Sequence, residues 1–295
     1  MSSINTNASA MNALSTLRGI NKSLEETQGR ISTGLKVESG KDNASYFQIS
    51  TTMNSESGMY SAINEGMTLA KSSVSTARLG AETLVDLTQQ FVDRLAFAQE
   101  EGVDQAAVGE ELKALVEQMK TTIDQSAFNG ENLISTTGTT AVGTTKTVTT
   151  GISRDAAGVL TTTKQSFGIV DLEALTGDPT AGTADDLSLA GIAESVATET
   201  YTADLETSLQ AADSFLTSIT QQATSLGVAE KAIENQQTFL NDLTDRISTG
   251  VSAMVDADME EEAARLQALQ VQQQLATQSL SIANSSPQNI LSLFR

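Results

Sequence analysis

INEGMTLAKSSVSTARLGAETLVDLTQQFVDRLAFA, residues 63–98, is the stretch that decides the fold of this chain. Apolar residues recur there at alternating spacings of three and four, and only Thr88 interrupts them. This spacing lines one face of an α-helix, so it predicts a long straight helix, on the order of 60 Å, with a coiled-coil seam. We expect Gly102 to end the helix. The seam residues are Ile63, Val74, Leu84, Phe91 and Leu95.

A second helix is predicted directly after the first, from about residue 104 to residue 127, again with one apolar face. Phe128, Asn129 and Gly130 follow it. Because Asn-Gly readily adopts positive φ, we expect Gly130 to lie in a turn that stops this helix. The two helices together predict a helical hairpin.

The far half of the chain repeats the helical spacing from Leu205 to Met254. Polar residues interrupt it at Glu230, Gln237 and Thr244, which indicates a seam that is partly wet or that specifies one register. We expect this segment to pair with the helix of residues 63–98. Its seam residues are Leu216, Ile219, Leu226, Ile233 and Leu240.

Both ends of the chain also carry amphipathic helical spacing. The apolar positions are Leu14, Leu17, Leu24 and Ile31 near the start, and Leu266, Leu269, Leu280 and Ile290 near the end. Two such helices would pair antiparallel, because isolated helices take most of their stability from packing. Residues 1–17 and 266–294 contain no charged residue, which favours burial against other protein over a solvated helix. The alternative is a disordered, sticky tail.

The pentapeptide RISTG occurs twice, at residues 30–34 and 246–250. Each copy lies between a heptad segment and the next block, so Gly34 and Gly250 are candidates for a helix C-cap or a hinge. Chance similarity in a Ser/Thr-rich chain is the other explanation.

The centre of the chain differs in composition from both halves. Residues 135–202 are rich in Thr, Gly and Ala, and short β-prone pieces occur at 146–150 and 166–172. We therefore expect a mainly α fold with long antiparallel helical hairpins, a coiled coil formed by both termini, and a small β-rich central insert. The expected domains are an inner terminal layer (1–43 and 251–295), a second helical layer (44–134 and 203–250) and a solvent-facing module of β-hairpins (135–202).

Composition excludes most catalytic chemistry. The chain has no Cys and no His, so it offers no thiolate, no imidazole base and no zinc site of the usual kind. The acids Asp256, Asp258 and Glu260 to Glu262 lack the loop of an EF-hand, and they fit an acidic helix N-terminus better than a metal site. We therefore predict no enzymatic activity, no metal and no cofactor.

Charge and hydropathy also limit the possible partners. The formal net charge is −20, and residues 44–250 carry −18 of it. A surface of this sign repels nucleic acid and anionic membrane. Residues 1–17 do not form a signal peptide of the Sec type, and no run of about 20 predominantly apolar residues predicts a membrane span.

Several stretches of the sequence resemble bacterial flagellin, with wording closest to the flagellins of alphaproteobacteria. They are INTNASAMNALSTLRGIN at 4–21, RISTGLKVESGKDNASYFQIS at 30–50, FNGENLI at 128–134 and the ending SSPQNILSLFR. Together with the helices that join them, they cover about two thirds of the chain and leave the Thr/Gly-rich centre unmatched.

The resemblance implies a secreted structural subunit that polymerises with itself into the extracellular flagellar filament for swimming. In this family the termini pair as an inner coiled-coil layer, and the partners are the type III export apparatus, an export chaperone, the junction proteins and the filament cap. Two alternatives remain open: a hook–filament junction protein, and a cytoplasmic coiled-coil signalling protein of the chemoreceptor kind.

Overall fold

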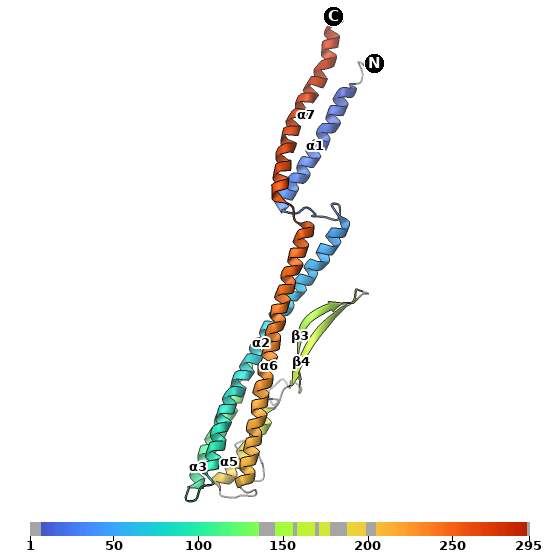
Figure 1. The fold of residues 1–295 in the computed structure, drawn as a ribbon. Helices are drawn as coiled ribbons and strands as arrows, with labels where there is room; N and C mark the ends of the chain where they lie inside the picture. The colour runs from blue at the N-terminus through green and yellow to red at the C-terminus, as the bar shows by residue number, and fades with distance from the viewer. Residues whose placement is uncertain are drawn as a thin grey trace. The chain divides into compact units, whose positions relative to one another are not determined.

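The computed structural model describes residues 7–135, 145–155, 158–168, 171–177, 188–198 and 205–293 (Figure 1). The chain divides into two compact units, which we call unit 1 and unit 2. Unit 1 comprises Met1–Gly58 and Asp245–Arg295, and unit 2 comprises Met59–Thr244. Both boundaries fall inside long helices, whereas the expected three-layer division follows the sequence blocks and stays a prediction.

Unit 1 contains α1 (Ala8–Thr33), the first turns of α2 (Ala44–Phe97), the last turns of α6 (Leu205–Val255) and α7 (Met259–Leu293). Helices α1 and α7 lie side by side and antiparallel (Figure 1). The side chain of Asn7 caps the start of α1 by accepting a hydrogen bond from the amide of Ala10. Gly34 is the C-cap of α1, with φ 74° in the left-handed region that glycine adopts without strain.

Backbone hydrogen bonds join the segment after α1 to the end of α6. The amides of Lys36 and Val37 donate to the carbonyl of Val255 at 2.6 and 3.2 Å. The amide of Ala257 donates to the carbonyl of Gly34 at 2.9 Å. Orphan groups at the ends of two helices are thereby satisfied by the crossing chain instead of by water.

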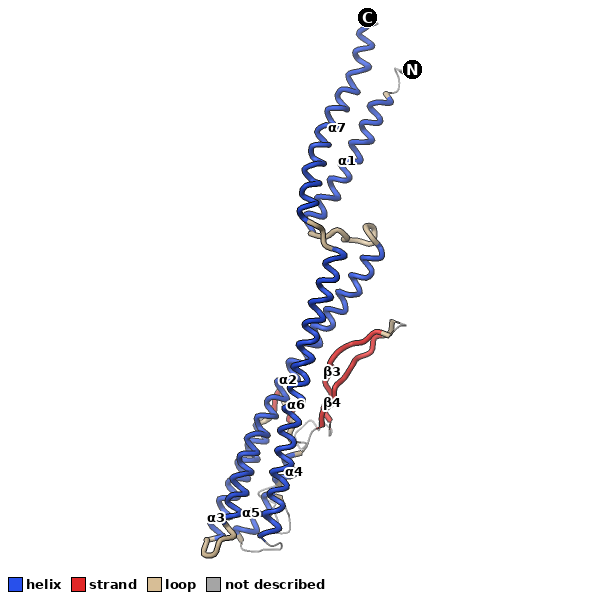
Figure 2. The backbone as a smooth tube through the Cα atoms, viewed as in Figure 1, coloured by secondary structure: helices blue, strands red, loops and turns tan. Residues whose placement is uncertain are grey.

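In unit 2, α2 and α6 lie side by side along a continuous buried seam (Figure 2). Helix α3 (Gln105–Gln125) adds a third buried face, which contains Leu112, Met119 and Ile123. The side chain of Asp104 caps α3 through the amide of Ala107. Full burial of one large apolar side chain contributes about 1.5–3 kcal/mol, so this core is the main source of stability in unit 2.

A tight turn follows α3. Strands β1 (Ala127–Phe128) and β2 (Glu131–Asn132) pair antiparallel around Asn129 and Gly130, whose φ angles are 53° and 80°. The side-chain amide of Asn132 donates to the carbonyl of Ile123 at 2.7 Å, which satisfies a carbonyl at the end of α3.

The central insert contributes one antiparallel hairpin, β3 (Thr145–Arg154) with β4 (Leu160–Gly168), and its register shifts between Thr149 and Gly151. Two short helices were not expected there: α4 (Leu172–Thr176) and α5 (Leu189–Ala197). The apolar side chains Leu172, Leu189 and Ile192 are buried in the core of unit 2, so tertiary packing makes these pieces helical. The expected pattern of several short hairpins is therefore wrong for the described part of the insert.

Two long helices also differ from expectation. Helix α2 starts at Ala44, nineteen residues before the seam read from the sequence, and it ends at Phe97 instead of running to Gly102. Gly250 lies inside α6, which continues to Val255, so a helix C-cap at Gly250 is wrong, while a hinge there stays a prediction. The mainly α fold class, with paired termini and a small β-containing insert, is confirmed.

A pair of glycine substitutions tests how α5 is held on α3. A Cβ built on Gly109 would collide with the backbone of Ala197, whereas a Cβ on Gly66, in the middle of α2, would meet nothing within 4 Å. We expect Gly109→Ala to lower the free energy of unfolding by about 1–3 kcal/mol because of overpacking. Gly66→Ala should raise it by about 0.5–1 kcal/mol through helix propensity. Urea unfolding followed by circular dichroism checks both signs, and equal effects would contradict the close approach.

Candidate assembly surface

The seam between α1 and α7 in unit 1 buries its side chains only in part. Half-buried positions on this seam are Leu17, Leu24, Ile31, Leu266, Leu269 and Leu280. Leu14 keeps 37% of its surface exposed. The side chain of Ile290 lies outside the described residues. The two helices alone therefore leave much of their apolar surface in contact with water.

Polar contacts fix the register of this pair. The side-chain amide of Asn7 donates to the carbonyl of Ala283 at 2.8 Å. Farther along, the amide of Gln273 donates to Oδ1 of Asn21 at 2.8 Å, and both residues are half-buried. A polar pair inside an apolar seam costs stability but specifies one alignment, because any slip leaves its groups unpaired.

Among the described residues, the most buried charged side chain in unit 1 is Glu262, in the first turn of α7. Its side chain keeps 7% of its surface exposed, and Oε1 lies 3.1 Å from Nη1 of Arg30 on α1. Oε2 has no hydrogen-bond partner among the described residues. The α7 N-terminus favours a negative charge at this place, so helix dipole and Arg30 together stabilise the carboxylate.

A small apolar cluster joins the ends of the helices in unit 1. It consists of the buried residues Val37, Val251 and Val255. The partly buried Leu35, Met53, Ile247 and Met254 pack around it. All of the largest fully buried side chains in the described residues belong to unit 2 instead. Unit 1 therefore has a very small core for its length.

Unit 1 also exposes more large apolar side chains than unit 2, although it is the shorter unit. The exposed residues of unit 1 are Met11, Leu14, Tyr46, Phe47, Ile49, Met259, Val271, Leu275 and Ile282. A concentration of exposed apolar side chains in one unit is typical of a surface that contacts protein or membrane. None of the described helices is long and apolar enough to cross a membrane.

The seam between α2 and α6 in unit 2 is much more deeply buried than the seam between α1 and α7. On α2, Val74, Leu84, Phe91 and Leu95 are at most 1% exposed, and Ile63 is half-buried. The corresponding residues of α6 behave in the same way: Ile219, Leu226, Ile233 and Leu240 are at most 2% exposed, and Leu216 is half-buried. Thr88, which breaks the apolar pattern, is fully buried, and its hydroxyl lies 4.0 Å from the sulfur of Met119 on α3.

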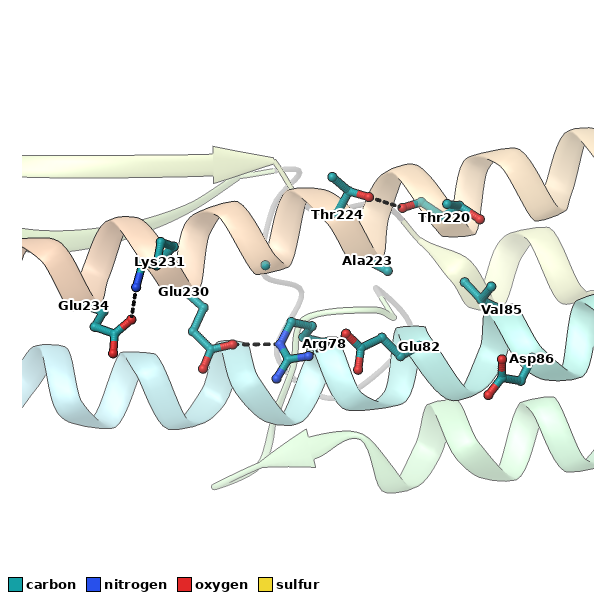
Figure 3. Close-up of a pocket in the computed structure, with 11 residues that line it drawn as sticks. Arg78, Glu82, Val85, Asp86, Thr220, Ala223, Thr224, Glu230, Lys231 and Glu234 are labelled. Atoms are coloured by element: carbon teal, nitrogen blue, oxygen red, sulfur yellow. Dashed lines mark hydrogen bonds and ion pairs between the residues drawn. The ribbon is translucent and has the colours of Figure 1, made fainter.

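Charged and amide side chains form a ladder of contacts between α2 and α6. Figure 3 shows its charged part around Arg78 and Glu230. Arg78 donates from Nε to Oε2 of Glu230 at 2.7 Å, and its Nη1 pairs with Glu82. The hydrogen bond to Glu230, followed by that to Glu82, raises the pKa of Arg78 above its usual value. The other rungs pair Lys71 with Glu234, Asn64 with Asn241, and Thr68 with Gln237.

Most polar side chains that line the groove beside this ladder are engaged with one another or with the helix backbone. The hydroxyls of Thr220 and Thr224 donate to carbonyls within α6. The carboxylates of Glu82, Glu230 and Glu234 are each paired with a cation. Structural ion pairs of this kind set the register of a helix pair.

Sequence reasoning located the apolar seams but missed the polar contacts across them. Arg30 and Glu262 are 232 residues apart, so no local pattern points to their pairing. Glu230 and Gln237, read as interruptions of the α6 seam, lie on its flank and bond to Arg78 and Thr68. Asp258 accepts hydrogen bonds from the amides of Glu260 and Glu261, so it caps α7.

Comparison with known proteins identifies two matching family regions. Residues 4–139 match the bacterial flagellin N-terminal helical region, and residues 209–294 match the bacterial flagellin C-terminal helical region. The chain is 38% identical to flagellin C of Rhizobium meliloti (strain 1021) over 322 aligned residues, and 38% identical to a flagellin of Brucella melitensis biotype 1 over 300. Each alignment covers 100% of both chains.

Two solved structures resemble the fold more distantly. The crystal structure of Bacillus cereus flagellin matches with a TM-score of 0.44 and 17% identity, over 59% of this chain and 88% of that one. A putative flagellar hook-associated protein from Vibrio parahaemolyticus matches with a TM-score of 0.46 and 10% identity, over 74% of this chain and 99% of that one.

Removal of Arg30 tests the contact that joins α1 to α7. We expect Arg30→Met to weaken unit 1 by about 2 kcal/mol, because the buried carboxylate of Glu262 then keeps only the more distant Arg265. The change should speed proteolysis within residues 7–58 and leave unit 2 intact. The double variant Arg30→Met/Glu262→Met should recover most of the resistance, and no recovery would show that Arg30 acts through other contacts.

Proposed function

The chain belongs to the bacterial flagellin family and is a structural subunit of the flagellar filament, and from this premise we propose that unit 1 is the part through which copies polymerise. The single observation that supports this most is the contrast in burial. Among the described residues, the shorter unit 1 holds nine of the sixteen exposed large apolar side chains and has a core of three valines, while unit 2 has a large buried core. A unit built in this way becomes well packed only against further copies.

The proposed contact is heterologous: one surface of a subunit meets a different surface of the next. Such a contact, repeated by a screw operation that does not close, gives an open helical polymer instead of a ring. We assign the terminal seam residues Leu14, Leu17, Leu24, Ile31, Leu266, Leu269, Leu280 and Ile290 to the assembling coiled coil. The seam of α2 and α6 supplies the rigid body that carries it.

Charge distribution supports the same assignment. Residues 266–294 contain no charged residue, and the net charge of −20 comes almost wholly from residues 44–250. Copies can therefore approach through the charge-free residues 1–17 and 266–294 while the acidic parts stay apart. In this proposal residues 1–43 and 251–295 form the inner layer, 44–134 and 203–250 the second layer, and 135–202 the outer module.

Folding of the ends is coupled to association in this proposal. The half-buried seam of α1 and α7 provides little stability on its own, so the free subunit orders these helices fully only when it joins the polymer. The subunit leaves the cell unfolded through the flagellar type III export apparatus, aided by an export chaperone, and meets the junction proteins and the cap at the filament tip. It acts outside the cell and catalyses no reaction.

The two alternatives gain no support. The full-length relatives reported above are flagellins, and neither a junction protein nor a chemoreceptor-like signalling protein is among them. Electron microscopy of the purified chain tests the proposal against a signalling protein, which forms no filaments. The abundance of the chain in filaments sheared from cells tests it against a junction protein, which occurs in few copies.

A charge placed in the α1–α7 seam should block polymerisation. In Leu24→Asp the half-buried seam would hold an unpaired carboxylate, at a cost of about 3 kcal/mol, which raises the concentration needed for assembly by about a hundredfold. Sedimentation of the polymer measures this. Val159→Asp, at an exposed position between β3 and β4, is the matched control and should assemble like the unchanged chain. Normal assembly of Leu24→Asp would refute the role of the seam.

Salt should favour assembly. Subunits of net charge −20 repel one another, and the Debye length falls from about 10 Å at 0.1 M to about 3 Å at 1 M sodium chloride. We therefore expect less soluble subunit at equilibrium as salt rises. Urea unfolding of the free subunit in the same buffers separates this from a change in subunit stability. A soluble fraction that is indifferent to salt would contradict the electrostatic argument.

A further inference from the structure

The first turns of α2 are exposed on every side. All six residues of Ala44–Ile49 are exposed, and three of them are large and apolar: Tyr46 at 42%, Phe47 at 39% and Ile49 at 45%. Farther along, α2 regains intramolecular contacts, because Ser50 is buried and Met53 packs on the cluster of Val37, Val251 and Val255. Within the described residues of α2, exposure of all faces at once is therefore confined to this segment.

The reason lies in the length of α6. Gly250 on α6 lies opposite Met53, with 3.8 Å between the position of a Cβ on Gly250 and the methyl carbon of Met53. The helices run antiparallel, so residues of α2 before Met53 would need partners on α6 after Gly250. Helix α6 ends at Val255, whose carbonyl accepts hydrogen bonds from the amides of Lys36 and Val37. Among the described residues of unit 1, no other helix covers Tyr46, Phe47 and Ile49.

The three apolar side chains point in different directions. Successive residues of an α-helix are about 100° apart, so Phe47 lies about 100° from Tyr46, and Ile49 lies about 160° from Phe47. A single partner with a flat surface can cover one side of this helix but cannot cover both Phe47 and Ile49. Burial of all three needs protein on at least two sides.

Composition marks the segment as a contact with protein. Aromatic residues make up 4% of the chain, yet Tyr46 and Phe47 are adjacent and both exposed. Exposed aromatic residues are enriched at the centres of protein interfaces. Residues 43–55 also contain no charged residue, so the strong negative charge of the chain does not oppose the approach of another copy at this point.

We propose that Ala44–Ile49 is a junction at which two further copies of the chain meet, one on the side of Phe47 and one on the side of Ile49. This inference rests on the proposed polymerisation, because only a repeating assembly places several copies around one segment. The inference goes further in one respect: the single segment Ala44–Ile49 contacts two neighbouring copies. Assembly through the terminal helices alone would not require this.

The absence of cysteine in the chain makes a labelling test clean. Single variants Tyr46→Cys, Phe47→Cys and Ile49→Cys are labelled as monomers with a bulky maleimide and mixed with an excess of unlabelled, unchanged chain under assembly conditions. Val159→Cys, labelled in the same way, is the control. We expect each of the three labelled chains to enter filaments at least about tenfold less than the control, because a buried contact has no room for the probe.

A second measurement distinguishes two neighbours from one. A photo-reactive diazirine side chain of leucine size replaces Phe47 or Ile49 in assembled filaments, and mass spectrometry locates the cross-linked peptides. We expect the two positions to cross-link to different segments of neighbouring copies. Cross-links from both positions to one segment would overturn the two-copy junction.

The outcomes separate this inference from the proposed function. If the unchanged chain forms filaments and any of the three labelled variants enters them as readily as the control, the junction is refuted while polymerisation stands. If the unchanged chain forms no filament under any assembly condition, the proposed function itself fails. Exclusion of all three probes with distinct cross-links supports the junction.

Discussion

The structure depends on the buried antiparallel seam between α2 and α6. This seam excludes water along Val74, Leu84 and Phe91 on one helix and along Ile219, Leu226 and Ile233 on the other. Apolar heptads alone permit slippage by one repeat, because every register buries similar residues. The ladder of Arg78 with Glu230, Lys71 with Glu234 and Asn64 with Asn241 removes that freedom, since a shifted register leaves charged and amide groups unpaired. These polar contacts thereby fix one alignment of α2 with α6 within unit 2.

The spacing of apolar residues predicted the helices well, because the same short-range repeat marks both a helix and the face that it buries. It failed where a residue's surroundings come from distant segments. Thr88 looks like a break in the α2 seam, yet it is fully buried against α3, which no window around residue 88 reveals. Helix α5 has a short apolar sequence that fits strand or helix equally, and its contact with α3, where Lys113 pairs with Glu194 at 2.8 Å, belongs to tertiary structure. The apolar positions of the α6 seam were predictable from their spacing, but the partners of Glu230 and Gln237 were not.

The distribution of charge and the distribution of apolar exposure complement each other. A chain of net charge −20 resists self-association, and the charge-free ends provide the places where copies can meet without local repulsion. Unit 1 keeps its one deeply buried carboxylate, Glu262, beside Arg30 and at the N-terminus of α7, so no uncompensated negative charge faces a neighbour there. Electrostatics thus favours contacts through unit 1, and the hydrophobic effect supplies their strength.

The two copies of RISTG show how packing overrules local sequence in this fold. At residues 30–34 the pentapeptide ends α1, and Gly34 takes φ 74°. At residues 246–250 the same five residues lie within α6, which continues for five more. The difference follows from the next residues. Val251 and Val255, four apart, face the same side of a helix and both enter the cluster with Val37, so continued helix is stabilised after Gly250. After Gly34, Leu35 instead forms a β-bridge with Asp256, and Lys36 and Val37 donate to Val255. The two outcomes depend on each other. Helix α1 must end at Gly34 so that Lys36 and Val37 can cap the end of α6, and α6 must continue past Gly250 so that Val255 reaches them.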